Sequence, residues 1–177
     1  AMILRQQIAK LGWTSQFTIY DQVDAKALIK AVIKKLNLDL KIYDPKSVLI
    51  KISLSKNNMQ SPKDLLSFAS NINEEKIAEI YTQYEDQLRE NNSVDFDDLL
   101  IKPLIIFDQY PEVLDYYRNK FQYVLVDEYQ DTNKPQFTFI HSLTEIKQDI
   151  FVVGDDDQSI YGWRGADITN ILNFKNS

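Results

Sequence analysis

The order of hydrophobic and polar residues predicts a first half that is built from helices. Between residues 25 and 36, apolar side chains recur every three or four positions and lysines occupy another face, which is typical of an amphipathic helix. Asp21 suits the N-cap of that helix, and Pro45 and Pro62 stand where the first turn of a helix tolerates proline. The predicted helices cover residues 2–11, 25–36, 45–57, 62–71 and 74–91, and residues 17–20 form a short extended run.

The second half alternates helices with two short apolar runs, at residues 123–126 and 150–153, that have the length and composition of buried strands. A helix predicted at residues 134–145 separates the two runs. A strand, helix, strand order implies parallel strands joined by a right-handed crossover. We therefore predict an α/β chain with a helical subdomain at residues 1–94 and a mixed domain at residues 95–177. Further helices are expected at residues 95–109, 111–119 and 167–174.

Charge is distributed unevenly between the two halves. The net charge is −6, but residues 1–94 hold 13 Lys and Arg against 11 Asp and Glu, whereas residues 95–177 hold 7 against 15. Residues 26–63 alone hold nine lysines and two aspartates, a net charge of +7. Such a local basic surface can contact nucleic-acid backbone although the whole chain is acidic. The absence of cysteine excludes disulfides and thiolate metal sites and fits a cytoplasmic protein.

The first apolar run ends abruptly in two adjacent carboxylates, Asp127 and Glu128, and continues as Tyr-Gln-Asp-Thr-Asn. Open α/β sheets place ligands at the carboxyl ends of their strands. Two acids at such a point are typical of a Walker-B site, in which one acid serves Mg²⁺ and the next orients a water against a phosphate.

The second apolar run continues into a polar turn and an aromatic segment punctuated by glycine. Residues 154–166 read Gly-Asp-Asp-Asp-Gln-Ser-Ile-Tyr-Gly-Trp-Arg-Gly-Ala. The three aspartates lack the spacing of an EF-hand, so no calcium site is predicted. Gly162 and Gly165 favour a loop in which Trp163 is exposed and can stack on an unpaired base. The alternative is that Trp163 is a core residue.

These two segments resemble motifs II and III of the UvrD/Rep-type superfamily 1 DNA helicases, which read roughly DEYQDTN and GDxDQSIYxWRGA. Residues 94–100, Val-Asp-Phe-Asp-Asp-Leu-Leu, resemble the segment that precedes motif II in that family. The lysine-rich first half agrees with the family's helical insert in length and helical character. The resemblance implies a helical insert followed by part of a RecA-like P-loop NTPase domain.

The resemblance also implies a nucleotide site. Asp127 would hold Mg²⁺ through water, Glu128 would position the attacking water, and Gln158 would sense the γ-phosphate of ATP. The alternative for Gln158 is an ordinary turn residue. The residues expected to support the motifs are Gln130, Asp131, Thr132, Asp97 and Asp98. Capping of the next helix is an alternative role for Thr132 or Asn133. For Asp95, Asp97 and Asp98, structural contacts are the favoured role.

DNA contacts are expected from both halves. By the resemblance, motif III grips single-stranded DNA and the helical insert contacts the duplex ahead of the motor. An ordinary solvated face is the alternative for the lysines, and Lys51 and Lys56 would join the basic patch only if the helices align. The candidate DNA-binding residues are Tyr161, Trp163, Arg164, Lys30 and Lys34.

No phosphate-binding loop of the form G-x-x-x-x-G-K-[ST] occurs among the 177 residues. We therefore expect an internal fragment of an ATP-dependent 3′–5′ DNA helicase of repair or replication, inactive by itself and a poor binder of ATP and Mg²⁺. The alternatives are a non-catalytic nucleic-acid-binding module and the related helicase–nucleases. Expected partners are single-stranded DNA, single-strand/duplex junctions and repair or replication proteins, with no membrane contact. A second copy is a further possible partner, through an uncovered edge of the sheet.

Overall fold

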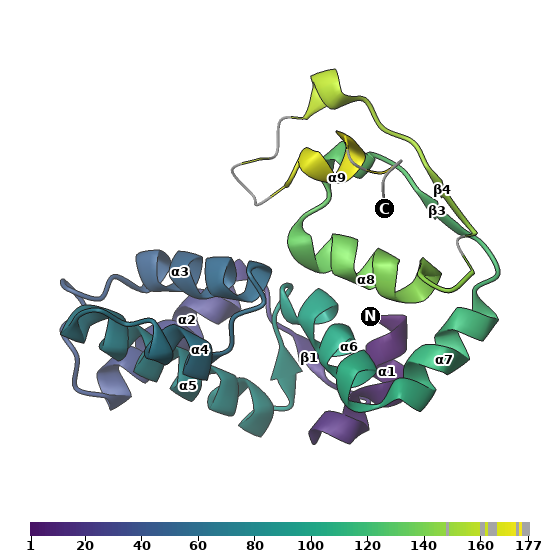
Figure 1. The fold of residues 1–177 in the computed structure, drawn as a ribbon. Helices are drawn as coiled ribbons and strands as arrows, with labels where there is room; N and C mark the ends of the chain where they lie inside the picture. Colours follow the sequence, from purple (N-terminus) through teal and green to yellow (C-terminus); the bar gives the residue numbers. More distant parts are fainter. Residues whose placement is uncertain (148, 160–161, 163–165, 173, 175–177) are drawn as a thin grey trace. The chain divides into compact units, whose positions relative to one another are not determined.

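The structure, a computed structural model, describes residues 1–147, 149–159, 162, 166–172 and 174 (Figure 1). The chain divides into two compact units, Ala1–Lys102 and Pro103–Ser177. The division falls inside helix α6 (Asp98–Gln109), whereas the sequence places the boundary after residue 94. The mixture of helices with parallel strands confirms the α/β class, and the functional identity of the two stretches remains a prediction.

The first unit is largely helical, as predicted. Its elements are α1 (Met2–Gln7), η1 (Ile8–Leu11), β1 (Thr18–Ile19), α2 (Gln22–Lys35), α3 (Pro45–Asn57), α4 (Pro62–Ser67), α5 (Ile72–Glu90), β2 (Ser93–Val94) and the start of α6.

Local capping explains where these helices begin. The Asp21 carboxylate accepts hydrogen bonds from the backbone of Val23 and Asp24, and Asp24 completes a capping box at the start of α2. Pro45 and Pro62 occupy the first turns of α3 and α4. Helix α4 ends at Ser67 and not at residue 71, because residues 70 and 71 instead cap the following helix α5.

A pair of two-residue parallel strands closes the helical region at its base. Thr18 pairs with Ser93 and Ile19 with Val94, so the chain segments that enter and leave the helices lie side by side. Strand β2 was not predicted, because two residues carry no periodic signal. The Trp13 indole strengthens the junction by donating to the carbonyl of Ser93 at 2.9 Å.

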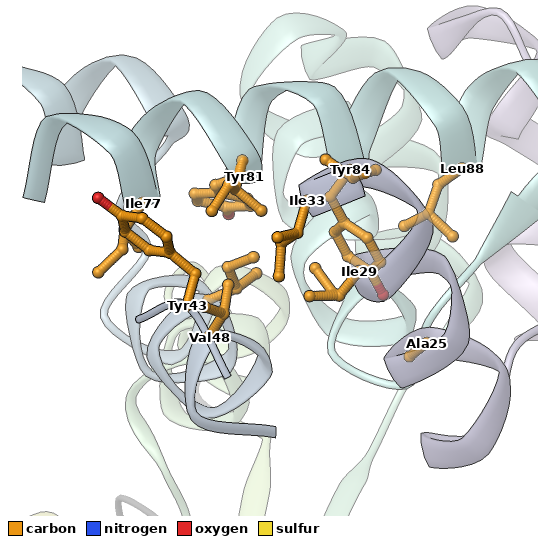
Figure 2. Close-up of a cluster of buried hydrophobic side chains, with 12 residues drawn as sticks. Ala25, Ile29, Ile33, Tyr43, Val48, Ile77, Tyr81, Tyr84 and Leu88 are labelled. Carbon is orange, nitrogen blue, oxygen red and sulfur yellow. The ribbon is translucent and has the colours of Figure 1, made fainter. Parts of the chain in front are cut away.

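The hydrophobic core of this unit lies between α2, α3 and α5 (Figure 2). Ile29 and Ile33 project from α2 toward Tyr84 and Leu88 of α5, and all four side chains are fully buried. Burying an aliphatic side chain of this size contributes about 1.5–3 kcal/mol, so these contacts hold the helices together.

A buried ionic cluster joins four segments of the same unit. The ammonium of Lys56, which is only 2% exposed, lies 2.6 Å from Glu85, 2.7 Å from Asp95 and 2.9 Å from Asp98. The Lys102 ammonium lies 3.2 Å from both Glu85 and Asp98. Helices α3, α5 and α6 and the turn after β2 each supply at least one member. Lys56 therefore does not join the basic surface patch, which the sequence left open, since its charge is enclosed by carboxylates.

Proton equilibria in the cluster follow from burial and charge. Burial lowers the pKa of Lys56, but the carboxylates of Asp98, Glu85 and Asp95 outweigh burial and raise this pKa well above the usual value. Burial raises the pKa of Asp95 to about 6, since Lys56 compensates only partly. Burial also tends to raise the pKa of Asp98, but the positive charges of Lys56 and Lys102 outweigh burial and hold this pKa below its usual range.

The second unit contains the predicted strand, helix, strand arrangement. Its elements, after the end of α6, are α7 (Pro111–Lys120), β3 (Val124–Val126), η2 (Tyr129–Asp131), α8 (Lys134–Thr144), β4 (Ile150–Val152), η3 (Asp156–Gln158) and α9 (Thr169–Leu172). Strands β3 and β4 pair in parallel, which confirms the prediction, with Leu125 opposite Phe151.

The β3–β4 sheet leaves apolar surface uncovered within the second unit. Leu125 and Phe151, which share a register position, are 76% and 63% exposed. Elsewhere in the unit, Phe107 stacks on Phe139 at 5.7 Å and contacts the fully buried Tyr117 at 6.0 Å between ring centroids. Among the described residues, no helix combines the length and the apolar character needed to cross a membrane.

The ionic cluster leads to a stability prediction. We expect Lys56→Met to lower the free energy of unfolding by about 3–5 kcal/mol, because it leaves buried carboxylates without their main counter-charge. The matched control is Lys76→Met, which removes a solvent-exposed ammonium that lies 2.7 Å from Glu79 and should cost less than about 1 kcal/mol. Urea unfolding of both variants measures the difference. Equal losses would show that the cluster does not stabilise the fold.

Candidate functional site

The carboxyl end of β3 carries the two acids of motif II. The parallel ladder continues beyond the strands, since Val153 N donates to the Val126 carbonyl at 2.8 Å and Tyr129 N donates to the Val153 carbonyl at 3.0 Å. Asp127 and Glu128 therefore lie at the end of the paired strands, and both side chains are exposed. One Asp127 oxygen accepts from Glu128 N at 2.9 Å.

Glu128 has a strained backbone. Its φ of 52° lies in the left-handed region, which residues other than glycine, asparagine and aspartate seldom adopt. Residues in such conformations cluster at functional sites, where surrounding contacts maintain them. Here the turn is held by η2, whose Asp131 N donates to the Glu128 carbonyl at 2.9 Å.

A chain of hydrogen bonds runs from Glu128 to motif III. Gln130 Nε2 donates to Glu128 Oε2 at 2.7 Å, and Gln130 Oε1 accepts from the backbone N–H of Asp155 at 3.0 Å. Asp155 Oδ2 in turn accepts from Gln158 Nε2 at 2.7 Å. The structure thus brings Glu128, Gln130 and Gln158, which were identified separately from the sequence, into one connected arrangement.

Gly154 permits the close approach of the two motifs. A Cβ atom at this position would lie 2.5 Å from Gln130 Oε1, 2.8 Å from Ile171 Cδ1 and 3.2 Å from Tyr129 N. A side chain would therefore displace the Gln130 amide or separate the two turns. In the sequence, this glycine is recognisable only as part of a motif, because the residues that surround it in space come from distant positions of the chain.

The segment that follows motif III returns to motif II. The Thr132 carbonyl accepts from Asp167 N at 3.1 Å and from Asn170 Nδ2 at 3.1 Å. Asn133 is the N-cap of α8, with a reciprocal bond to Gln136, and it forms an antiparallel bridge with Ala166. Of the two residues considered for this cap, Asn133 therefore fills the role, and Thr132 anchors the returning segment.

Three predicted DNA-binding residues, Tyr161, Trp163 and Arg164, lie outside the described residues. The positions on either side of them are fixed to motif II. Before them, Gln158 bonds to Asp155, which bonds to Gln130, and after them Asp167 bonds to Thr132.

The predicted lysine patch is exposed in part. Lys26, Lys30 and Lys34 are exposed at four-residue intervals on α2, so they form one stripe along the helix. Lys51 is also exposed, on α3, whereas the buried Lys56 is excluded from any surface contact.

Asp97 and Asp98, predicted to support the motifs, belong to the first unit. Asp98 is buried in the ionic cluster, and its backbone N–H donates to Asp95 Oδ1 at 2.9 Å. Asp97 accepts from Asn57 Nδ2 at 3.2 Å. These contacts agree with the structural role favoured for the pair. Sequence reasoning missed Glu85 and Lys102 as members of the cluster, because an acid or a lysine on a helix ordinarily faces solvent.

Asp131 has one buried carboxylate oxygen, Oδ1, for which the described residues provide no hydrogen-bond partner. A buried acceptor without a donor is costly, so this oxygen marks an incomplete part of the motif II surroundings.

Known proteins similar to the chain agree with the resemblance that the two motifs carry. A family model described as "UvrD/REP helicase N-terminal domain" matches residues 1–177. Proteins named "ATP-dependent DNA helicase PcrA" from Bacillus subtilis strain 168 and from Staphylococcus aureus strain Mu50 are each 46% identical over 173 residues. The matches cover 98% of this chain but 23% and 24% of those proteins, so the chain spans about a quarter of the length of the curated relatives it matches.

Proposed function

Because the chain belongs to the UvrD/REP helicase family, we propose that it forms part of a longer ATP-dependent DNA helicase that couples ATP hydrolysis to 3′–5′ movement along single-stranded DNA and to duplex unwinding. Membership in the family confirms the resemblance inferred from motifs II and III. Roles in DNA repair or replication, and binding to single-strand/duplex junctions, belong to the same proposal.

The observation that carries this proposal is the hydrogen-bonded chain from Glu128 through Gln130 and Asp155 to Gln158. It connects the acid proposed to position water with the amide proposed to sense the γ-phosphate. These two functions must lie close together in an enzyme that hydrolyses ATP, since the water attacks the phosphate that the amide senses.

The residues at the end of β3 fit a magnesium–nucleotide complex. Asp127 presents an exposed carboxylate, and Mg²⁺ prefers oxygen ligands and retains several waters. Asp127 would hold the ion through water, and Glu128 would orient the attacking water. When bound, the ion neutralises charge on the phosphates of ATP. The phosphate-binding loop would come from another part of the longer protein.

DNA contacts are proposed at two places. Tyr161, Trp163 and Arg164 lie three to six positions after Gln158 in the chain, so nucleotide sensing and the grip on single-stranded DNA would be neighbours in sequence. Lys30 and Lys34, on the exposed stripe of α2, would contact the phosphates of the duplex.

The uncovered apolar side chains Leu125 and Phe151 would be covered by further parts of the longer protein. In a solution of the 177-residue chain alone, the same sheet would favour self-association, because exposed strand edges and apolar faces pair readily.

The role of Glu128 can be tested in the full-length helicase. Glu128→Gln should reduce DNA-stimulated ATP turnover by about 10³-fold or more while ATP binding stays near normal, because the variant loses the group that positions water. Steady-state kinetics and equilibrium binding of a non-hydrolysable analogue measure the two effects. The 177-residue chain alone should show no turnover above background. Turnover by that chain that Glu128→Gln removes would contradict its expected inactivity, and turnover by the full-length protein that survives Glu128→Gln would contradict the proposed role of Glu128.

The lysine stripe makes a separate prediction about the duplex. Charge reversal by Lys30→Glu with Lys34→Glu should weaken duplex binding similarly for all sequences and flatten its dependence on salt, because phosphate contacts are electrostatic. Fluorescence anisotropy at several salt concentrations measures both properties in the full-length protein. Lys76→Glu with Arg89→Glu, at two exposed pairs on α5, changes the net charge by the same amount and is the control. If the control weakens binding equally, the stripe makes no specific contact.

Trp163 is predicted to stack on a base. Trp163→Ala should weaken single-strand binding of the full-length protein by about 1–3 kcal/mol, the value typical of one base–aromatic stack. Its melting temperature should fall far less than expected for emptying a buried aromatic site, which costs about 3–5 kcal/mol. Unchanged affinity together with a collapsed melting temperature would identify Trp163 as a core residue.

A further inference from the structure

The side chain of Gln130 is fully buried between the two motifs, and both ends of its amide are used. We propose that Gln130 is a positioning residue: it orients the Glu128 carboxylate for its work on water and ties that orientation to the Asp155–Gln158 turn. This inference rests on the proposed ATPase function, and it assigns Gln130 a task beyond support of the motif.

The geometry of Glu128 calls for such a residue. Its side chain is exposed, so packing against its own segment does little to restrict its rotamers. Within the described part of the chain, the Glu128 carboxylate receives one side-chain hydrogen bond, the 2.7 Å contact from Gln130 Nε2. Because Gln130 is immobilised by burial, this contact fixes the direction in which the carboxylate points.

The primary amide of Gln130 satisfies both of its neighbours. The Glu128 carboxylate needs a donor, and the Asp155 N–H needs an acceptor. A glutamate at this position would set two carboxylates against each other, and a lysine would leave the Asp155 N–H without an acceptor. The amide also adds no charge, so the negative charge of the motif remains for the proposed metal ion.

The connection also links Glu128 with the proposed phosphate sensor. Gln158 holds the Asp155 side chain, and the Asp155 backbone holds the other end of the Gln130 amide. A change of partner at Gln158 would shift the Asp155 turn. This shift would reach Glu128 through two half-buried hydrogen bonds, from Asp155 N–H to Gln130 and from Gln130 to Glu128.

Two substitutions break the connection in independent ways. Gln130→Met keeps the length and volume of the side chain and removes both hydrogen bonds. Gly154→Ala does not change the Gln130 residue itself. The added Cβ would lie 2.5 Å from Gln130 Oε1 and would push the amide out of its position. Gln136→Met is the matched control, since Gln136 also bonds a backbone N–H, that of Asn133 at 3.0 Å, and lies outside the connection.

The first measurement is hydrogen–deuterium exchange of the full-length helicase without nucleotide. In Gln130→Met and in Gly154→Ala, a peptide that contains Asp155 should exchange about 2- to 10-fold faster, the change that accompanies loss of one hydrogen bond. Gln136→Met should leave this peptide unchanged. Unchanged exchange in both test variants would show that the connection does not exist in solution and would overturn the proposal.

The second measurement is kinetic. Gln130→Met should lower kcat for ATP by about 100-fold, the size of effect that follows from slight misplacement of a catalytic group, while binding of a non-hydrolysable analogue stays within about twofold. Added to Glu128→Gln, Gln130→Met should reduce turnover no further, because the two residues act as a unit. Independent, additive losses or an unchanged kcat would identify Gln130 as a packing residue.

The two measurements separate this inference from the proposed function. If Glu128→Gln leaves turnover intact, the proposed role of Glu128 fails whatever Gln130 does. If Glu128→Gln abolishes turnover but Gln130→Met changes exchange without changing kcat, the proposed function stands and the positioning role is wrong.

Discussion

The fold of the first unit depends on the burial of Lys56 among three carboxylates. Its ammonium contacts Glu85, Asp95 and Asp98 within 2.6–2.9 Å, and Lys102 supplies a second positive charge. Taking such charges out of water is costly unless every partner is in place, so the cluster accepts only one arrangement of α3, α5 and α6. The apolar core between α2, α3 and α5 supplies stability, while the cluster specifies which segments meet. The paired strands β1 and β2 then fix both ends of the helical region beside it.

Local features of the sequence were enough to predict most elements. Helix α3 has the bounds predicted from Pro45 and the following pattern, and the parallel pairing of β3 with β4 followed from the strand, helix, strand order. Strand β2 escaped prediction because its two residues are defined by their partner and not by their own pattern. The burial of Lys56 could not be predicted either. It is one of nine lysines in residues 26–63, and its acidic partners lie about 30 to 40 positions further along the chain.

The candidate site could be predicted as a list of residues but not as a set of contacts. Asp127 and Glu128 had to lie at a strand end, because an apolar run stops at them. The bond between Gln130 and Asp155 depends on two turns that approach each other, and on the absence of a side chain at Gly154. Neither condition is visible in either motif alone. The same holds for Thr132, whose importance lies in holding the segment at Asp167 and Asn170.

The two units surround their clustered carboxylates in opposite ways. In one cluster the acids are neutralised and hold the fold together, and in the other their charge stays available for binding. In the ionic cluster of the first unit, Asp95 and Asp98 are buried and matched by lysines, so their negative charge is neutralised inside the fold. In the second, Asp127, Glu128 and Asp155 are exposed, and the described residues join them through amides and backbone N–H groups that leave their negative charge intact. A lysine at Gln130 would also connect the turns, but it would neutralise the charge that a metal–nucleotide complex requires. A neutral connection therefore lets the two motifs approach closely, and no cationic side chain of the described residues pairs with the negative charge at the ends of the strands, which is available to a cation.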